Sequence, residues 1–415
     1  MPSIEIAAGE RDATRSGDAC ALAKTTGDLT IAWESDASEV PAPAISGFVS
    51  DVLASHAPPV AESTVDRVLA IVLGSRRTRF APRPDAEGCA LVRRRIAAAV
   101  AREEPVSFLT MWGAIKHYVR DEDQGVDLAE LFAVLRLVQL ARDVAEVHPP
   151  GAVVHVIVED FGVWYEDAYG FPASVQSAIA SGSRRYVSEL IRLCEVVGGP
   201  ALQAHTFGET VDVDPRECLA RVERNRELLE AYWTAPPGTD AEAFDRLSRA
   251  GWRGRILEDT RAHYRARLAK LYPDEDHARH VHRICRYLAM VLLYEQLEML
   301  RAVAPDAIRL AFYRPAPGLG RERLLGRVHL RGLPKPSCST VMPPWTARGC
   351  LVVGDDGALR PRIESYLRLL ASGSTYDRGA LRIARDGREA GVRMDVVSFD
   401  RRFGRGLSLK RYGRP

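Results

Sequence analysis

Two short apolar runs joined by one long amphipathic segment restrict the possible fold of this chain more than any other feature. The runs VSFLTMW (106–112) and AVVHVIVED (152–160) are rich in β-branched and aromatic residues, and the second is typical of a strand covered on both faces. Residues 126–147 carry apolar side chains at helical spacing, with Asp127 as a candidate N-cap and Glu130 three residues later, which is the pattern of a capping box. This order predicts a βαβ unit with two adjacent parallel strands.

The rest of the chain shows further helical and strand periodicity. We expect helices at 65–74, 86–103 and 172–197, a helix-rich stretch over 214–302, and strands at 307–313, 326–332, 350–356 and in MDVVSFDRR. The predicted fold class is α/β, with a Rossmann-like parallel-sheet core, a helical insertion and a C-terminal mixed α+β part. The expected domains are an N-terminal extension with one short hairpin at most, the α/β core, the helical segment, and C-terminal strands and helices that complete the site, with boundaries at 1–60, 61–213, 214–302 and 303–415.

Composition excludes several classes of protein. The 415 residues are 46% hydrophobic and 27% charged, which is too apolar for a disordered chain. A formal net charge of +2 gives no electrostatic basis for a nucleic-acid partner. No apolar segment reaches the roughly 18 residues of a membrane span, and no signal peptide is evident. The seven cysteines are scattered and never spaced as CxxC, so we expect reduced thiols in a cytoplasmic protein.

Motifs for common cofactors are missing from the sequence. No G-x-G-x-x-G follows a predicted strand, and neither a P-loop nor a G-x-S-x-G pattern occurs, which argues against a nucleotide cofactor and a serine hydrolase. One competing site is DEDHARHVHRICR, where His277, His280 and His282 follow two aspartates. Such clusters bind zinc or iron, but on a helix only the first two histidines share a face. A polar helix start is favoured, and no metal is predicted.

Three charged residues lie at or near predicted strands, whose carboxyl ends border the ligand crevice of an open α/β sheet. Asp160 ends the second strand and either binds an amine, acts as a base, or caps a turn. Lys116, one of only five lysines, follows the first strand and is either an anion ligand or an exposed loop cation. Arg309 lies inside an apolar strand, where it pairs with a structural carboxylate or binds an anionic substrate group.

The aromatic residues near these positions each have two interpretations. Trp164 and Tyr165, which follow the second strand together with the carboxylate of Asp167, either stack on an aromatic substrate or pack against the core. Tyr313 ends the strand at 307–313 and is either a proton donor or structural. Trp345 is a packing anchor in its Pro-rich turn or a pocket wall.

Segments of this chain, taken in order, resemble the isonitrile synthases, the family related to pyoverdine and dityrosine biosynthesis. PVSFLTMWGAIK (105–116) with VDLAEL (126–131) is similar to the family's strand, aromatic-Pro-aromatic-Lys signature and Pro-Asp-x-x-Glu helix start. VHPPGAVVHVIVEDFGVWYED (147–167) resembles its aromatic-Pro-Pro-Gly-Ala, strand and Asp-Gly-x-x-aromatic-x-Asp loop. AIRLAFYRP (307–315) and MPPWTARGCLVV (342–353) resemble its Ile-Arg-Leu-Ser-x-His strand and Thr-Pro-Trp-His turn.

The chain departs from the family pattern at several positions. Val126 stands where the family has proline, and Ala311 where it has serine. The family's two histidines are replaced, by Phe312 or Tyr313 in the strand and by Thr346 in the turn. If those histidines transfer protons, this chain either uses other groups for the same chemistry or catalyses a different reaction.

The resemblance implies an enzyme of natural-product biosynthesis. Isonitrile synthases join the amino group of an aromatic amino acid to the ketone of ribulose 5-phosphate, and the nitrogen retains one carbon as an isonitrile; no metal or redox cofactor is implied. The alternatives are a divergent member that catalyses another condensation, cleavage or rearrangement of an amino acid, and a non-catalytic binding subunit. The expected partners are a free amino acid and a phosphosugar, with neither nucleic acid nor membrane, and the oligomeric state is not predicted. The candidate catalytic residues are Lys116, Asp160 and Tyr313, and the candidate substrate-binding residues are Arg309, Trp164, Asp167, Trp345 and Glu130.

Overall fold

The structure is a computed structural model of the whole chain. It describes residues 6–7, 22–26, 29–35, 59–74, 86–113, 125–160, 173–210, 213–236, 239, 241–250, 276–297, 303–311, 327–329, 333–335, 338–342, 347–353, 359–365 and 373–399.

A five-stranded parallel sheet forms the centre of the α/β core. Its strands lie in the order β6-β5-β4-β7-β8, and each neighbouring pair is parallel. The first predicted strand is β4 and the second is β5, and they pair along their whole length from Val106↔Ala152 to Gly113↔Glu159. The predicted parallel strand pair and α/β fold class are therefore confirmed. The bounds are β4 Val106–Gly113, β5 Ala152–Glu159, β6 Leu202–Thr206, β7 Ile308–Ala311 and β8 Arg327–His329.

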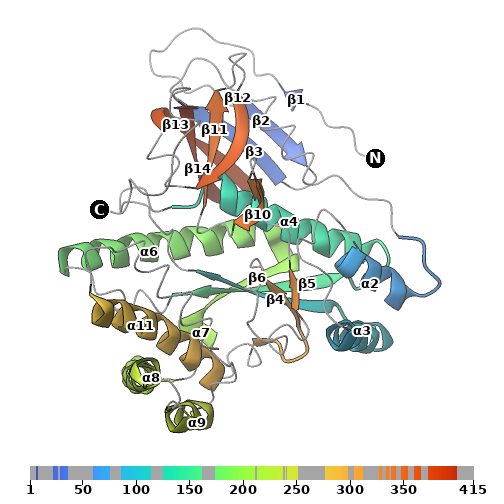
Figure 1. Cartoon of the computed structure of the whole chain (residues 1–415). Coiled ribbons are helices and arrows are strands. Elements are labelled where there is room, and N and C mark those ends of the chain that lie inside the picture. The colour runs from blue at the N-terminus through green and yellow to red at the C-terminus, as the bar shows by residue number, and fades with distance from the viewer. Residues whose placement is uncertain are drawn as a thin grey trace.

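The helix that joins β4 to β5 is α4 (Leu128–Ala145), and it is buried on almost all sides. Its first turn has the predicted capping box: Asp127 Oδ1 accepts the Ala129 N–H at 2.8 Å, and Glu130 Oε2 accepts the Asp127 N–H at 2.9 Å. Figure 1 shows the cause of the burial, because α4 lies between the parallel sheet and a second sheet. A helix covered from both sides needs apolar residues around its circumference.

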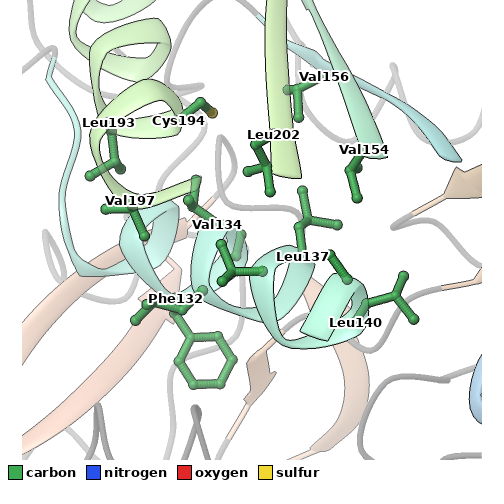
Figure 2. Packing of buried hydrophobic residues seen from close by; sticks show 14 of the residues in the cluster. Phe132, Val134, Leu137, Leu140, Val154, Val156, Leu193, Cys194, Val197 and Leu202 are labelled. Atoms are coloured by element: carbon green, nitrogen blue, oxygen red, sulfur yellow. The ribbon is translucent and has the colours of Figure 1, made fainter. Parts of the chain in front are cut away.

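Figure 2 shows how α4 packs against the parallel sheet. Val134 and Leu137 lie beside Val154 of β5 and Leu202 of β6, and all four belong to one buried apolar cluster. Phe132 points the other way, away from these strands. One helix thus holds the two layers together.

Three further helices contribute to the buried cluster that contains α4. They are α2 (Thr64–Gly74), α3 (Ala86–Ala101) and α6 (Ala173–Leu193), and all three were predicted. The third was predicted to run to residue 197, but the α-helix ends at Leu193 and continues as a π-helical turn over Cys194–Gly198. Gly199 follows with a φ of 53°, a conformation that favours glycine, and the chain enters β6.

The second sheet has seven strands and combines strands from the N-terminal part of the chain with strands from the C-terminal part. Its order is β1-β2-β3-β13-β14-β11-β12. In the N-terminal stretch, where we expected one short hairpin at most, β2 pairs with β3 and β1 also pairs with β2. The strand β3 in turn pairs with β13, for example Ile31 with Ile383. The predicted C-terminal strands therefore divide between the two sheets. The bounds are β1 Ile6–Ala7, β2 Leu22–Thr26, β3 Leu29–Ser35, β11 Ala347–Val353, β12 Leu359–Ser365, β13 Gly373–Arg385 and β14 Arg388–Phe399, and a separate hairpin consists of β9 Leu333–Lys335 and β10 Cys338–Met342.

Two hydrogen bonds donated by backbone N–H groups of the second sheet attach it to the start of α4. Asp127 Oδ1, besides capping the helix, accepts the Gly349 N–H of β11 at 2.9 Å, and the Arg393 N–H of β14 donates to the Val126 carbonyl at 2.9 Å. Gly349 lies so close that an added Cβ would be 2.5 Å from the Ala129 nitrogen. Only glycine allows β11 to approach the helix this closely.

A helical layer lies on the other side of the parallel sheet, below it in Figure 1. Leu109 of β4 and Ile157 of β5 share a second buried apolar cluster with these helices. The predicted helix-rich segment is therefore confirmed in its described parts. None of the helices in the described ranges is long and apolar enough to cross a membrane. The bounds are α7 Phe207–Thr210, α8 Pro215–Thr234, α9 Ala241–Arg249 and α11 His277–Gln296.

Asp143 is a buried carboxyl group on α4 that should make stability depend on pH. Burial, helped by the charge of Glu146, raises the pKa of Asp143 from 3.8 to about 6. Because the folded pKa is the higher one, the folded protein binds more protons, and stability falls as pH rises from about 4 to about 6. Asp143→Asn should remove this fall and stabilise the protein at pH 7.5 by up to about 3 kcal/mol. Urea denaturation of both proteins at several pH values measures the difference.

The matched control is Asp245→Asn on an exposed position of α9. It should change stability by less than about 0.5 kcal/mol at every pH. A difference between Asp143→Asn and wild type that stays constant from pH 4 to 7.5 would contradict the proposed origin of the effect.

Candidate functional site

The order of the strands creates a topological switch point beside β4. The chain builds β4, β5 and β6 outward on one side and then returns to the other side of β4 with β7 and β8. In open α/β sheets, ligands bind outside the carboxyl ends of the strands at such a point. Here the two strands at the switch end at Gly113 and Ala311. Lys116 and Tyr313 follow these ends in the sequence and lie outside the described residues.

Asp160 is the candidate that the structure describes in most detail. It follows the last residue of β5, its exposed fraction is 8%, and its Oδ1 accepts the Gly208 N–H of α7 at 3.2 Å. Burial raises the pKa of Asp160, and the negative charge of Glu209 adds to this rise. Hydrogen bonds from the backbone at Phe207 and Gly208 act in the opposite direction. A buried carboxyl group with a raised pKa at a strand's carboxyl end is suited to binding an amine or transferring a proton.

Arg309 lies in the second position of β7, rather than at its carboxyl end, and is partly buried. Its Cα pairs with Leu109 of β4 on one side and with Arg327 of β8 on the other. Paired residues of parallel strands project to the same face, so Arg309 shares the sheet face of Leu109, which is the face covered by the helical layer. Its two predicted roles, structural ion pair and anion ligand, both stay predictions.

Glu130 has well-defined structural contacts. It is fully buried; Oε2 closes the capping box, and Oε1 accepts the Tyr186 hydroxyl of α6 at 3.0 Å. Burial, followed by the charge of Glu130, raises the pKa of Tyr186 well above its ordinary value. These contacts fix the start of α4, and the predicted contact with substrate stays a prediction. The remaining site candidates lie outside the described residues: Lys116, Trp164, Asp167, Tyr313 and Trp345.

Two histidines that the sequence did not single out lie next to each other on β5 and β6. The rings of His155 and His205 are stacked with centroids 5.7 Å apart and an interplanar angle of 24°. Burial lowers the pKa of both, and the charge of His205 lowers that of His155 further. The only sequence signal was a polar residue inside the apolar run AVVHVIVED. Their proximity depends on the strand register, which pairs Ile157 with His205.

The competing histidine cluster begins α11. His282 Nδ1 lies 2.7 Å from Glu230 Oε1 of α8, and Glu230 also accepts a hydrogen bond from Arg226 at 2.7 Å. His277 is exposed, and the side chain of His280 is outside the described set. Within the described part of the chain, no three histidine, cysteine, aspartate or glutamate side chains gather as a metal site requires. The described side-chain contact of His282 is thus a hydrogen bond between α11 and α8.

Solved structures that resemble this chain include two of low sequence identity. The crystal structure of the PvcA protein from Pseudomonas aeruginosa aligns at 19% identity over 80% of this chain and 100% of its own, with a TM-score of 0.45. The Mycobacterium tuberculosis protein Rv2275, from work relating cyclodipeptide synthetases to type I tRNA synthetases, aligns at 15% identity over 62% of this chain and 97% of its own, with a TM-score of 0.29. No family model and no curated protein matched.

Proposed function

We propose that the protein is a biosynthetic enzyme that binds a free amino acid at the carboxyl edge of the parallel sheet and modifies its amino group. The observation that carries the proposal is Asp160, a buried carboxyl group with a raised pKa directly after the central strand β5. Its charged form would attract the substrate ammonium group, and its protonated form would return a proton. The reaction class that the sequence resemblance supports is that of an isonitrile synthase, with ribulose 5-phosphate as the second substrate.

The other candidate residues have complementary roles in this proposal. Lys116 and Arg309 would hold the carboxylate and phosphate groups of the two substrates, since both side chains are cationic. The sheet order supports a shared site, because β5, β4 and β7 are neighbours and the three residues lie in or after these strands. Tyr313 would donate a proton in place of a family histidine. Trp164, Trp345, Asp167 and Glu130 would form the walls and polar contacts of the pocket.

The test is incubation of the purified protein with pooled amino acids, with and without ribulose 5-phosphate, followed by mass spectrometry. The proposed reaction predicts a product that retains the amino-acid nitrogen with one additional carbon, and only when the phosphosugar is present. A product formed without the phosphosugar would support a divergent reaction. Binding of an amino acid with no product would support the non-catalytic alternative. Failure to bind any amino acid, measured by calorimetry, would refute the proposal.

A further inference from the structure

The stacked rings of His155 and His205 each carry a buried nitrogen that makes no hydrogen bond within the described residues. His155 Nδ1 and His205 Nε2 are both buried, and neither has a hydrogen-bond partner among the residues that the structure describes. A buried polar atom without a hydrogen-bond partner destabilises the folded state, so such atoms in a native protein call for a functional explanation. Two such atoms lie on adjacent rings, and a bound ligand would supply the missing contacts.

The pair projects from the sheet face that also carries Arg309. Along β5, Val154, Val156 and Val158 pack in the cluster that contains α4, while Ile157 packs in the cluster of the helical layer. Because side chains alternate along a strand, His155 lies on the Ile157 side. The register aligns His155 with Leu109 and Leu109 with Arg309. An imidazole pair and a guanidinium group therefore share one face, separated by one apolar strand.

Asp160 connects this pair to the proposed site. The carboxyl group follows β5 and accepts the Gly208 N–H, and Gly208 lies three residues after His205 in the turn that leaves β6. Both histidines and the carboxyl group therefore belong to the same two neighbouring strands, β5 and β6. His205 lies three residues before Gly208 and His155 five residues before Asp160, so His205 is the ring nearer in register to an amine bound by Asp160.

We propose that His155 and His205 together form the general base that removes a proton from the amino group of the bound amino acid. This inference rests on the proposed function and names the group that makes the amine reactive. One ammonium N–H bond breaks, its proton forms a new N–H bond on an imidazole nitrogen, and the nitrogen of the substrate gains a lone pair. The amine lone pair then forms a C–N bond to the ketone carbon of the phosphosugar, and a second N–H proton moves from this nitrogen to the former ketone oxygen. The imidazolium gives its proton to the same oxygen, the C–O bond breaks and water leaves, which yields a protonated imine and restores the neutral pair.

The electrostatic surroundings favour neutral rings at neutral pH. Burial lowers the pKa of both histidines, and the two rings disfavour simultaneous protonation because like charges repel. Glu209 of α7 opposes this by raising the pKa of His205. Of the described groups, no other charged side chain shifts the pKa of either ring. The two rings take up protons one at a time, and the apparent pKa values belong to the pair.

The test combines turnover with a titration of the rings in the full-length protein. His155→Gln and His205→Gln should each lower kcat by about 10²- to 10⁴-fold. Because the rings act as a unit, the kcat of the double variant should be no lower than that of the less active single variant. In wild type, histidine ring signals in NMR spectra should show two apparent pKa values below the ordinary 6.5. In His205→Gln, the pKa of His155 should rise, and the acid limb of the residual kcat profile should move to higher pH with it.

Controls separate this inference from the proposed function. His277→Gln, at an exposed position of α11, should leave kcat and its pH profile unchanged. Turnover that persists in both pair variants, with an unmoved acid limb, would overturn the inference and leave the proposed function standing. A wild-type protein that binds no amino acid would overturn both. If the glutamine variants do not fold, ring signals of wild type that stay unchanged on binding an amino acid substrate would overturn the inference.

Discussion

Asp160→Asn should lower turnover by about 10²- to 10⁴-fold, the usual contribution of a positioned acid or base. Asparagine keeps the shape of the side chain, and its oxygen can still accept the Gly208 N–H that Asp160 Oδ1 accepts at 3.2 Å. The substitution replaces one carboxylate oxygen with an NH2 group and so removes the negative charge and the titratable proton. Because burial raises the pKa of the carboxyl group, the asparagine should cost the fold little or nothing.

The measurement is kcat at saturating amino acid, with thermal unfolding as a test of the fold. The matched control is Asp214→Asn at the start of α8, where the aspartate Oδ1 also accepts a backbone N–H, from Arg216 at 2.6 Å. It changes the same atoms outside the candidate site, so turnover should stay within a factor of about two of wild type. Equal turnover in Asp160→Asn and wild type would exclude Asp160 from catalysis.

Asp395→Asn should destabilise the protein by about 3–5 kcal/mol, the cost of breaking a buried ion pair. Asp395 is fully buried on β14. Its Oδ2 accepts hydrogen bonds from both Nε and Nη2 of Arg348, the first at 2.7 Å, and its Oδ1 accepts one from Arg393 Nε at 3.3 Å. Removing the carboxylate charge leaves the largely buried guanidinium of Arg348 without this counter-ion. The broken ion pair lies between β11 and β14, two strands of the second sheet that contact the start of α4.

Urea denaturation at neutral pH measures this loss as a lower midpoint. The control is Glu389→Gln, which removes a carboxylate from the same strand. Its partner Arg382 lies 3.7 Å away, and both side chains are about half exposed, so the expected change is less than about 1 kcal/mol. Equal midpoints for the two variants would show that the buried network contributes no more than a surface pair.

The parallel core was predictable because its elements have strong local signals. The strands β4 and β5 are continuous apolar runs, and α4 begins with the complete capping box of Asp127 and Glu130. The strand β6, LQAHT, was not predicted: it is short, and only Leu202 is buried, so its pattern resembles a loop. Much of the β13–β14 hairpin was missed for a similar reason, since GSTYDRGALRIAR alternates charged and apolar residues too irregularly to indicate a strand.

The candidate site, like the fold, was predictable from the sequence only in part. Asp160 was predictable because a carboxylate directly follows an apolar strand. The pairing of His155 with His205 was not, because it depends on which strand neighbours β5 and in which register. The second function of Asp127, accepting the Gly349 N–H, was also hidden, since these residues are far apart in the sequence. Local patterns predict elements, whereas contacts between distant elements depend on the complete topology.

The pairing of β3 with β13 has a consequence for biosynthesis of the protein. Ile31 and Ile383 are partners, so a ribosome that adds about 5–20 residues per second exposes the N-terminal hairpin for tens of seconds before its neighbour exists. During that time β3 is an open sheet edge, which is prone to pair with other chains. The long sequence separation also gives the second sheet a high contact order, and hence slow folding. Yield of active protein should therefore depend on translation speed and on chaperones that bind nascent chains.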